Sequence, residues 1–378
     1  MLLSARRLVL PGADQPAPGW VEIDGERIVG VGAGDPPRPG AEELNGLVSP
    51  GLVDVHSHGG GGASFITTDP GQVRQVLRTH RAHGTTTMVA SLVTASIDDL
   101  EAQVRVLAPF VAEGELAGVH LEGPWLAEGR KGAHEAGLLR DPTTADIDRL
   151  LAAADGAIRL VTMAPERNGA PAAIAQLNRA GVVVAVGHTE ADLVTTVEAI
   201  DAGASGATHL FNAMPSLGHR NPGPVLGLLR DPRVFLELIF DGVHVDAELA
   251  AFVVNHWPGR VALITDAMAA AASADGDYLL GGLAVQVRDG VARVAGTQTI
   301  AGSTLTLDRA VRTAVASGVP VMAALRAATQ IPAAYLGLGE VGSLTAGRRA
   351  DLVVFDDDLY PVSVMRSGRW CQPAASAG

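Results

Sequence analysis

The sequence predicts an α/β fold, a (β/α)8 TIM-like barrel with a small β-sandwich domain built from both chain termini. Eight short apolar runs alternate with segments of helical spacing between residues 49 and 335, which is typical of a barrel. The two ends of the chain contain short strands and turns without helical spacing. The 378 residues, 47% of them apolar, suffice to bury a core of that size.

The predicted organisation follows the chain in three parts. Residues 1–48 form the first part of the small β domain, residues 49–335 form the barrel, and residues 336–378 complete the small domain. Segments between the strands, such as 72–84 and 172–181, have helical spacing, and a glycine ends the second of them. The eight predicted barrel strands are 51–58, 85–90, 117–124, 158–165, 182–189, 205–211, 234–244 and 261–268.

Composition and charge argue against several classes of protein. A formal charge of −13 without any basic block disfavours a nucleic-acid surface. No apolar run approaches the ~20 residues of a membrane span, and Arg6 and Arg7 stand where a signal peptide would need its apolar region. The single cysteine, Cys371, excludes an internal disulfide. We therefore expect a cytoplasmic protein that binds neither nucleic acid nor a membrane.

Residues of the metal-ligand type end most of the predicted barrel strands. Active sites of such barrels form at the C-terminal ends of the strands, so these side chains are expected to meet at one mouth. A lone histidine there is more often an ordinary polar residue, but a set from six strands favours zinc or another first-row divalent ion. The set consists of His56 and His58 on the first strand, Glu122 on the third, His188 on the fifth, His209 on the sixth, Asp241 and His244 on the seventh, and Asp266 on the eighth.

The first strand carries two histidines one residue apart, in the stretch "VDVHSHGGGG". Alternation along an extended chain directs both imidazoles to the same face. The glycines at 59–62 let the backbone pass close to an ion or a substrate without Cβ clashes. The pair either holds an ion or merely lines the mouth.

Motifs along the chain resemble the amidohydrolase superfamily and, within it, the N-acetylglucosamine-6-phosphate deacetylases. "VDVHSH" and "ADLVVFD" are typical of the superfamily, whereas "HLEGPW" and "HLFNAM" are specific to the deacetylases. "KGAH", "VGHT", "RNPGP", "FDGVH" and "ITDAM" occur in the same order, so the resemblance covers about residues 45 to 356. It implies a metal-dependent hydrolase of amino sugar metabolism that removes the acetyl group of N-acetylglucosamine 6-phosphate.

The resemblance also implies a ligand set. Many two-metal amidohydrolases use a carboxylated lysine at the end of the fourth strand, but the only lysine here, Lys131, follows the third. Glu122 would supply the negative ligand instead, and with His188 and His209 it makes a three-ligand catalytic site with an open position. His56 and His58 would hold a second ion, which gives one or two divalent ions per subunit, zinc being the expected metal.

Further residues acquire roles from the same resemblance. Asp266 is the implied acid–base group, which accepts a proton from the attacking water and delivers it to the departing amine. Arg220, in the loop "FNAMPSLGHRNPGP", is implied to bind the sugar phosphate, for which a guanidinium is suited. His219 beside it departs from the family pattern. The other implied substrate contacts are His134, Asn212, Ala213, His244, Ala301, Gly302 and Ser303, and the expected assembly is a homodimer.

Two alternatives remain open at this point. A different amidohydrolase, such as a dihydroorotase, a dipeptidase or a purine deaminase, is disfavoured by the single lysine and by "HLEGP", and a panel of substrates would distinguish it. A barrel that serves only as a scaffold would show a decayed ligand set, whereas every expected ligand and Asp266 are present.

Overall fold

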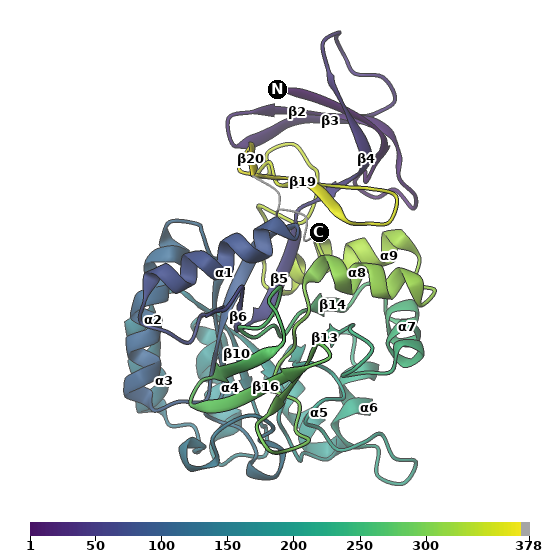
Figure 1. Cartoon of the computed structure of the whole chain (residues 1–378). Coiled ribbons are helices and arrows are strands. Elements are labelled where there is room, and N and C mark those ends of the chain that lie inside the picture. Colours follow the sequence, from purple (N-terminus) through teal and green to yellow (C-terminus); the bar gives the residue numbers. More distant parts are fainter. Residues whose placement is uncertain (372–378) are drawn as a thin grey trace.

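An eight-stranded parallel sheet forms the centre of the molecule in the computed structural model, which describes residues 1–371 (Figure 1). The sheet closes because the backbone amide of Asp266 donates to the carbonyl of His56 at 2.9 Å and Ser57 bridges Ala267. The predicted barrel is therefore confirmed, with a shorter sixth strand. In order, the strands are β5 (Leu52–Ser57), β8 (Thr85–Val93), β9 (Gly118–Glu122), β10 (Ile158–Met163), β11 (Val183–Val186), β12 (Gly206–Ala207), β13 (Phe235–Ile239) and β14 (Val261–Ile264).

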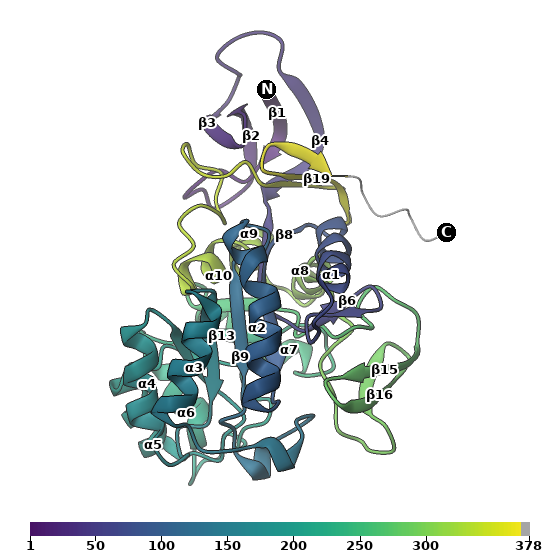
Figure 2. The ribbon, with the colours of Figure 1, turned by 90° about the vertical axis from the view of Figure 1, so that its left-hand side faces the viewer.

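Helices connect the strands and cover the outside of the barrel (Figure 2). The first begins where Asp69 accepts a hydrogen bond from the amide of Gly71, and its residues Val73, Val76 and Leu77 face the barrel and are buried. None of the helices within residues 1–371 is long and apolar enough to span a membrane. They are α1 (Pro70–Ala82), α2 (Ile97–Ala112), α3 (Thr144–Ala154), α4 (Ala170–Arg179), α5 (Leu193–Asp201), α6 (Gly223–Arg230), α7 (Ala247–His256), α8 (Leu307–Ala316), α9 (Val321–Ala327) and α10 (Gln330–Tyr335), with the 3-10 turns η1 (Glu128–Arg130) and η2 (Ala136–Leu138).

The two chain ends pair in a separate seven-stranded sheet at the amino ends of the barrel strands (Figure 1). Strand β4 joins them, because it pairs with β1 in parallel and with β18 antiparallel. Buried side chains from both ends, among them Leu3, Ile28, Leu352 and Met365, share one core. The strands are β1 (Leu2–Leu8), β2 (Ala17–Asp24), β3 (Arg27–Ala33), β4 (Glu42–Pro50), β18 (Leu352–Phe355), β19 (Pro361–Arg366) and β20 (Arg369–Cys371).

A third small sheet, which the sequence patterns did not indicate, lies at the opposite end, beside the mouth of the barrel. Its strands β15 (Gly276–Leu280), β16 (Leu283–Arg288) and β17 (Val291–Val294) are antiparallel and follow the last barrel strand (Figure 2). Leu280 and Val285 pack with Val93 and Met268 in a cluster of their own. A two-stranded piece, β6 (Gly59–Gly60) with β7 (Ala63–Ser64), lies next to the first barrel strand.

Candidate metal centre

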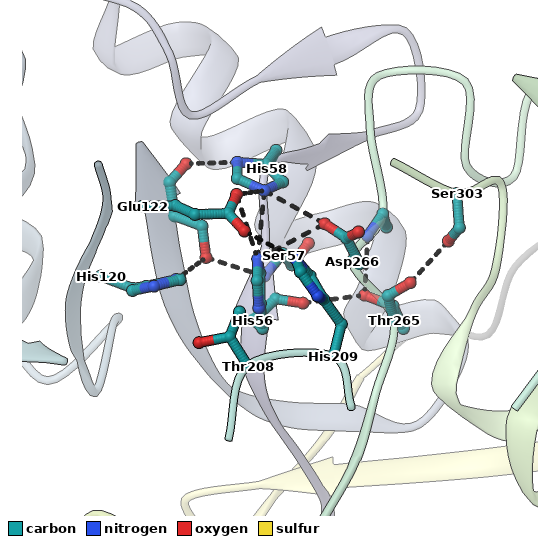
Figure 3. Close-up of polar contacts among 12 residues, drawn as sticks. His56, Ser57, His58, His120, Glu122, Thr208, His209, Thr265, Asp266 and Ser303 are labelled. Carbon is teal, nitrogen blue, oxygen red and sulfur yellow. Dashed lines mark hydrogen bonds and ion pairs between the residues drawn. The ribbon is translucent and has the colours of Figure 1, made fainter. Parts of the chain in front are cut away.

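Six side chains of the predicted ligand type converge at the carboxyl ends of the barrel strands, and Figure 3 shows most of them. The centre is buried, since each of the six residues is at most 8% exposed. Because parallel strands all end on the same edge, residues far apart in the sequence meet here. They are His56 at the end of β5, His58 just after it, Glu122 at the end of β9, His188 after β11, His209 after β12 and Asp266 after β14.

The first half of the centre, which we call the β5 side, contains His56, His58 and Asp266. The Nε2 atoms of His56 and His58 lie 3.2 Å apart. Oδ1 of Asp266 is 3.4 Å from Nε2 of His56 and 3.1 Å from Nε2 of His58. Glu122 completes this group with its Oε2, 3.2 Å from Nε2 of His58. The predicted histidine pair therefore points into a common space with two carboxylates.

The second half, which we call the β11 side, contains His188 and His209. Their Nε2 atoms lie 3.0 Å apart. The other oxygen of Glu122, Oε1, is 3.2 Å from Nε2 of His188 and 3.0 Å from Nε2 of His209. One carboxylate therefore faces both halves, and the centre has the shape of two sites bridged by Glu122.

The hydrogen bonds behind the imidazoles show that this arrangement fits a cation. Nδ1 of His58 lies 3.1 Å from the carbonyl of Ser91, and Nδ1 of His188 lies 2.8 Å from the carbonyl of Arg130. A carbonyl can only accept, so Nδ1 is the donor in both rings and Nε2 of the neutral ring carries a lone pair. These lone pairs face the oxygens of Glu122, which also accept. Acceptors directed at acceptors need a positive charge between them, which a proton or a divalent ion can supply.

Three of these residues have a backbone conformation that side chains other than glycine seldom adopt. The φ angles of His188, His209 and Asp266 are +46°, +29° and +49°. Two backbone hydrogen bonds hold the conformation of Asp266. Its amide donates to the carbonyl of His56, and its carbonyl accepts from the amide of Ser303 at 2.7 Å. Such conformations are typical of functional sites, where the surrounding structure compensates the strain.

Burial and nearby opposite charges shift the pKa values of the residues of the centre in opposite directions. Burial lowers the pKa of His56, but the charges of Glu122 and Asp266 outweigh it and hold that pKa well above its usual range. Burial likewise raises the pKa of Asp266, but the charge of His56 and the polar contact with His58 outweigh it and hold that pKa below its usual range. Asp266 is therefore ionised near neutral pH and can accept a proton.

A cavity of about 320 Å³ opens above the metal centre. Several of the predicted substrate contacts line it, together with residues from the third small sheet and the segment after it. The predicted residues at its wall are His58, Glu122, His134, His188, His209, Asn212, Ala213, His244, Asp266 and Gly302. Leu280, Thr299 and Ile300 add a wall that was not predicted, because the sequence patterns did not indicate the third sheet.

The two predicted substrate histidines differ in their partners. Nδ1 of His134 is 2.9 Å from the hydroxyl of Thr94, and burial lowers the pKa of this histidine to about 4, so it is neutral. Nδ1 of His244 donates to Asp241 at 2.7 Å. Burial lowers the pKa of His244, but its bond to Asp241 outweighs this and raises it. Asp241 therefore accepts a hydrogen bond from His244 and is not one of the potential ligands of the metal centre.

Other predicted contacts lie elsewhere. Arg220 is exposed in the loop before α6 and is not among the residues that line the cavity, so its phosphate contact stays a prediction. Ala301 is buried, and the hydroxyl of Ser303 donates to the carbonyl of Thr265 at 2.6 Å. The cavity instead contains Arg130, which the sequence analysis missed; its Nε is buried without a hydrogen-bond partner. Its position beside Lys131 in the "KGAH" segment was the only available signal.

Comparison with known proteins agrees with this site. The model of the amidohydrolase family matches residues 47–371. An N-acetylgalactosamine-6-phosphate deacetylase of Escherichia coli O157:H7 is 37% identical over 97% of this chain and 98% of its own length. An N-acetylglucosamine-6-phosphate deacetylase of Bos taurus is 36% identical over 85% of this chain and 82% of its own.

A solved structure resembles the chain over almost its whole length. It is a mutant N-acetyl-D-glucosamine-6-phosphate deacetylase of Mycobacterium smegmatis in complex with N-acetyl-D-glucosamine-6-phosphate. The two chains share 51% sequence identity and a TM-score of 0.95, and the match covers 98% of each. The sequence motifs, the bridged metal centre and these relatives agree: the chain belongs to the amidohydrolase family.

Proposed function

We propose that this protein hydrolyses the N-acetyl amide of N-acetylglucosamine 6-phosphate to glucosamine 6-phosphate and acetate. The observation that carries the proposal is the carboxylate of Glu122 between two pairs of histidines, at the floor of a cavity. Relatives that match 97% and 85% of this chain are named as deacetylases of N-acetylgalactosamine 6-phosphate and of N-acetylglucosamine 6-phosphate. The scaffold alternative would leave this complete ligand set without a use.

The residues of the chain divide the reaction between them. A bound divalent ion would supply a Lewis acid that lowers the pKa of water and polarises the acetyl carbonyl. Asp266 accepts a proton from the water while the oxygen of that water attacks the acetyl carbon. When the C–N bond breaks, Asp266 delivers that proton to the amine nitrogen. His134 and His244, at the cavity wall, contact the sugar or its carbonyl, and Arg220 binds the phosphate.

The metal is expected to be zinc, because nitrogen and carboxylate ligands at a buried site suit that ion. The β11 side with Glu122 offers three protein ligands, which is the number typical of catalytic zinc. The β5 side would hold a second ion. The cytoplasmic location and the homodimer also remain predictions.

A second candidate substrate is the galactosamine epimer of the same sugar phosphate. It is favoured by the relative that is named as an N-acetylgalactosamine-6-phosphate deacetylase and is matched over 98% of its length. Both epimers carry the same amide and phosphate, so the same chemistry would act on either. They differ at one hydroxyl, and the wall of the cavity decides which is preferred.

The metal-loaded protein is expected to release acetate from N-acetylglucosamine 6-phosphate and to lose this activity on treatment with a chelator. Added Zn²⁺ should restore it, because the ion supplies the Lewis acid. Release of acetate is measured with both epimers and with unphosphorylated N-acetylglucosamine. Full activity in protein shown to be free of metal would refute the proposal. Faster turnover of the galactosamine epimer would make N-acetylgalactosamine 6-phosphate the proposed substrate instead.

Arg220→Ala is expected to lower kcat/KM for N-acetylglucosamine 6-phosphate by roughly 30-fold. This figure holds if the loop closes over the bound phosphate and desolvates the pair, because loss of one partner from such a pair typically costs ~2–5 kcal/mol. The unphosphorylated sugar should be affected far less. Arg230→Ala, an exposed arginine at the end of α6, is the matched control. Arg130→Ala forms the third arm. Equal losses for both sugars would exclude Arg220 as the phosphate ligand, and a phosphate-specific loss in Arg130→Ala would assign that contact to the arginine inside the cavity.

A further inference from the structure

A carboxylate that none of the roles above uses lies beneath the metal centre. Glu237 is in the middle of β13 and is 0% exposed. Its Oε2 lies 3.0 Å from Nδ1 of His56, on the side of the ring opposite the cluster. Its Oε1 accepts a hydrogen bond of 3.2 Å from the hydroxyl of Tyr335, the last residue of α10. Within residues 1–371, neither Lys nor Arg forms an ion pair with Glu237.

The position of Tyr335 depends on features that leave room for its hydroxyl. A Cβ at Gly206, on the neighbouring strand β12, would lie 1.9 Å from that hydroxyl, so any side chain there would displace it. The ring of Tyr335 stacks on Phe235, with the ring centres 5.2 Å apart. Burial and the charge of Glu237 hold the pKa of Tyr335 well above its usual range, so it stays a donor. Tyr335 is therefore a fixed hydrogen-bond donor to Glu237 in the interior beneath the metal centre.

Two of the other three imidazoles of the centre have a different kind of partner, and Nδ1 of His209 is buried without a hydrogen-bond partner. His58 and His188 donate from Nδ1 to backbone carbonyls, which are neutral. Only for His56 among these three is the acceptor a carboxylate. A charged acceptor fixes the ring more strongly, leaves Nε2 as the lone pair directed at the cluster, and raises the basicity of that nitrogen. A fully buried carboxylate is also costly unless a positive charge lies near it.

We propose that Glu237, held by Tyr335, is a positioning residue that orients His56 and makes the β5 side able to bind its own ion. The inference rests on the proposed two-part metal centre. Glu237 touches neither substrate nor the ion and acts through the imidazole of His56. Ion binding on the β11 side does not depend on it, because within residues 1–371 no side-chain hydrogen bond or ion pair joins Glu237 to His188 or His209.

The test is a titration of metal-free protein with Zn²⁺ against a competing chelator, with metal content measured independently by mass spectrometry. Wild type is expected to bind two ions. Glu237→Gln should bind the first as wild type does and the second roughly 10–100-fold more weakly, the usual effect of removing such a partner. Tyr335→Phe should show a smaller weakening of the second ion. Unchanged binding of both ions by Glu237→Gln would overturn the proposal.

Controls separate this role from damage to the fold. Asp308→Asn removes another buried carboxylate, whose Oδ1 lies 3.5 Å from Nδ1 of His83. Asp308 is not one of the residues of the metal centre, so this variant should leave both ions in place. Thermal unfolding of each metal-free variant reports its stability. If Glu237→Gln fails to fold, the binding of the second ion by Tyr335→Phe decides the test.

A spectroscopic readout decides the proposal without any bound ion. In protein with ¹⁵N-labelled histidine, the Nδ1–H of His56 should give a strongly hydrogen-bonded signal that shifts or disappears in Glu237→Gln. If wild type binds a single ion, the two-ion part of the proposed function fails, and this signal alone decides whether Glu237 positions His56. An unchanged signal in Glu237→Gln would overturn that positioning.

Discussion

Asp266→Asn is expected to lower kcat by roughly 10²–10⁴, the usual contribution of a positioned acid–base group. The amide of asparagine keeps the shape of the side chain but cannot take up the proton of the attacking water. Asp266 is suited to this role because it is ionised and its Oδ1 lies 3.1 Å from Nε2 of His58, at the edge of the cavity. Initial rates over a range of substrate concentrations separate kcat from KM, which should change little.

Two controls accompany this variant. Metal content must be measured, because Asp266 belongs to the group of potential ligands on the β5 side and its loss could also release an ion. Asp277→Asn, an exposed carboxylate on β15 near the mouth, should keep wild-type turnover. If Asp266→Asn retains most of its turnover with its metal in place, the proton is accepted by another residue, and His244 is the next candidate.

The sequence allowed the barrel and the convergence of its ligands to be predicted because both follow from strong local rules. Strand alternation places His56 and His58 on one face, and parallel strands bring their carboxyl ends to one edge. The position of Glu122 at the end of the third strand was also foreseen. The structure adds that its two oxygens face different halves of the centre, which depends on a rotamer and on neighbouring rings and has no signature in the sequence.

The features that were missed depend on tertiary contacts. Glu237 appeared only as one polar residue within the apolar run "VFLELIF", and its partners lie 181 and 98 residues away in the chain. A carboxylate in the middle of a fully buried strand is itself a signal, because it requires a partner. The third sheet was missed because its strands are short and mix buried, half-buried and exposed residues. The path of the loop around Arg220 is not set by any periodicity, so its glycines and prolines did not show where the guanidinium lies.

The two halves of the metal centre are expected to differ in what they contribute. The β11 side combines two imidazoles with the shared carboxylate and lies at the wall of the cavity, as expected for the ion that activates the amide. The β5 side lies deeper, since His56 is fully buried, and it depends on a carboxylate partner. An ion there would reinforce the charge at Glu122 and near Asp266 without occupying the open position.

Glu122→Gln is expected to abolish turnover, by a factor on the order of 10³ or more. Glu122 contributes an oxygen to each half, so its replacement by a neutral amide removes the only negative ligand of the β11 side and one of two on the β5 side. The Lewis acid that would be lost is worth several kcal/mol of transition-state stabilisation, and about 1.4 kcal/mol corresponds to a factor of ten. Metal content and turnover are measured on the same preparation, and neither ion should be retained with wild-type affinity.

His56→Ala provides the contrast, because it removes a ligand from the β5 side alone. It should keep one tightly bound ion and a larger share of its turnover than Glu122→Gln. Glu190→Gln, an exposed glutamate after β11, is the control for the loss of a carboxylate near the mouth. If His56→Ala is as inactive as Glu122→Gln while it still holds one ion, then the ion of the β5 side is obligatory for catalysis, and the reacting carbonyl must be activated by both ions together rather than by the β11 side alone.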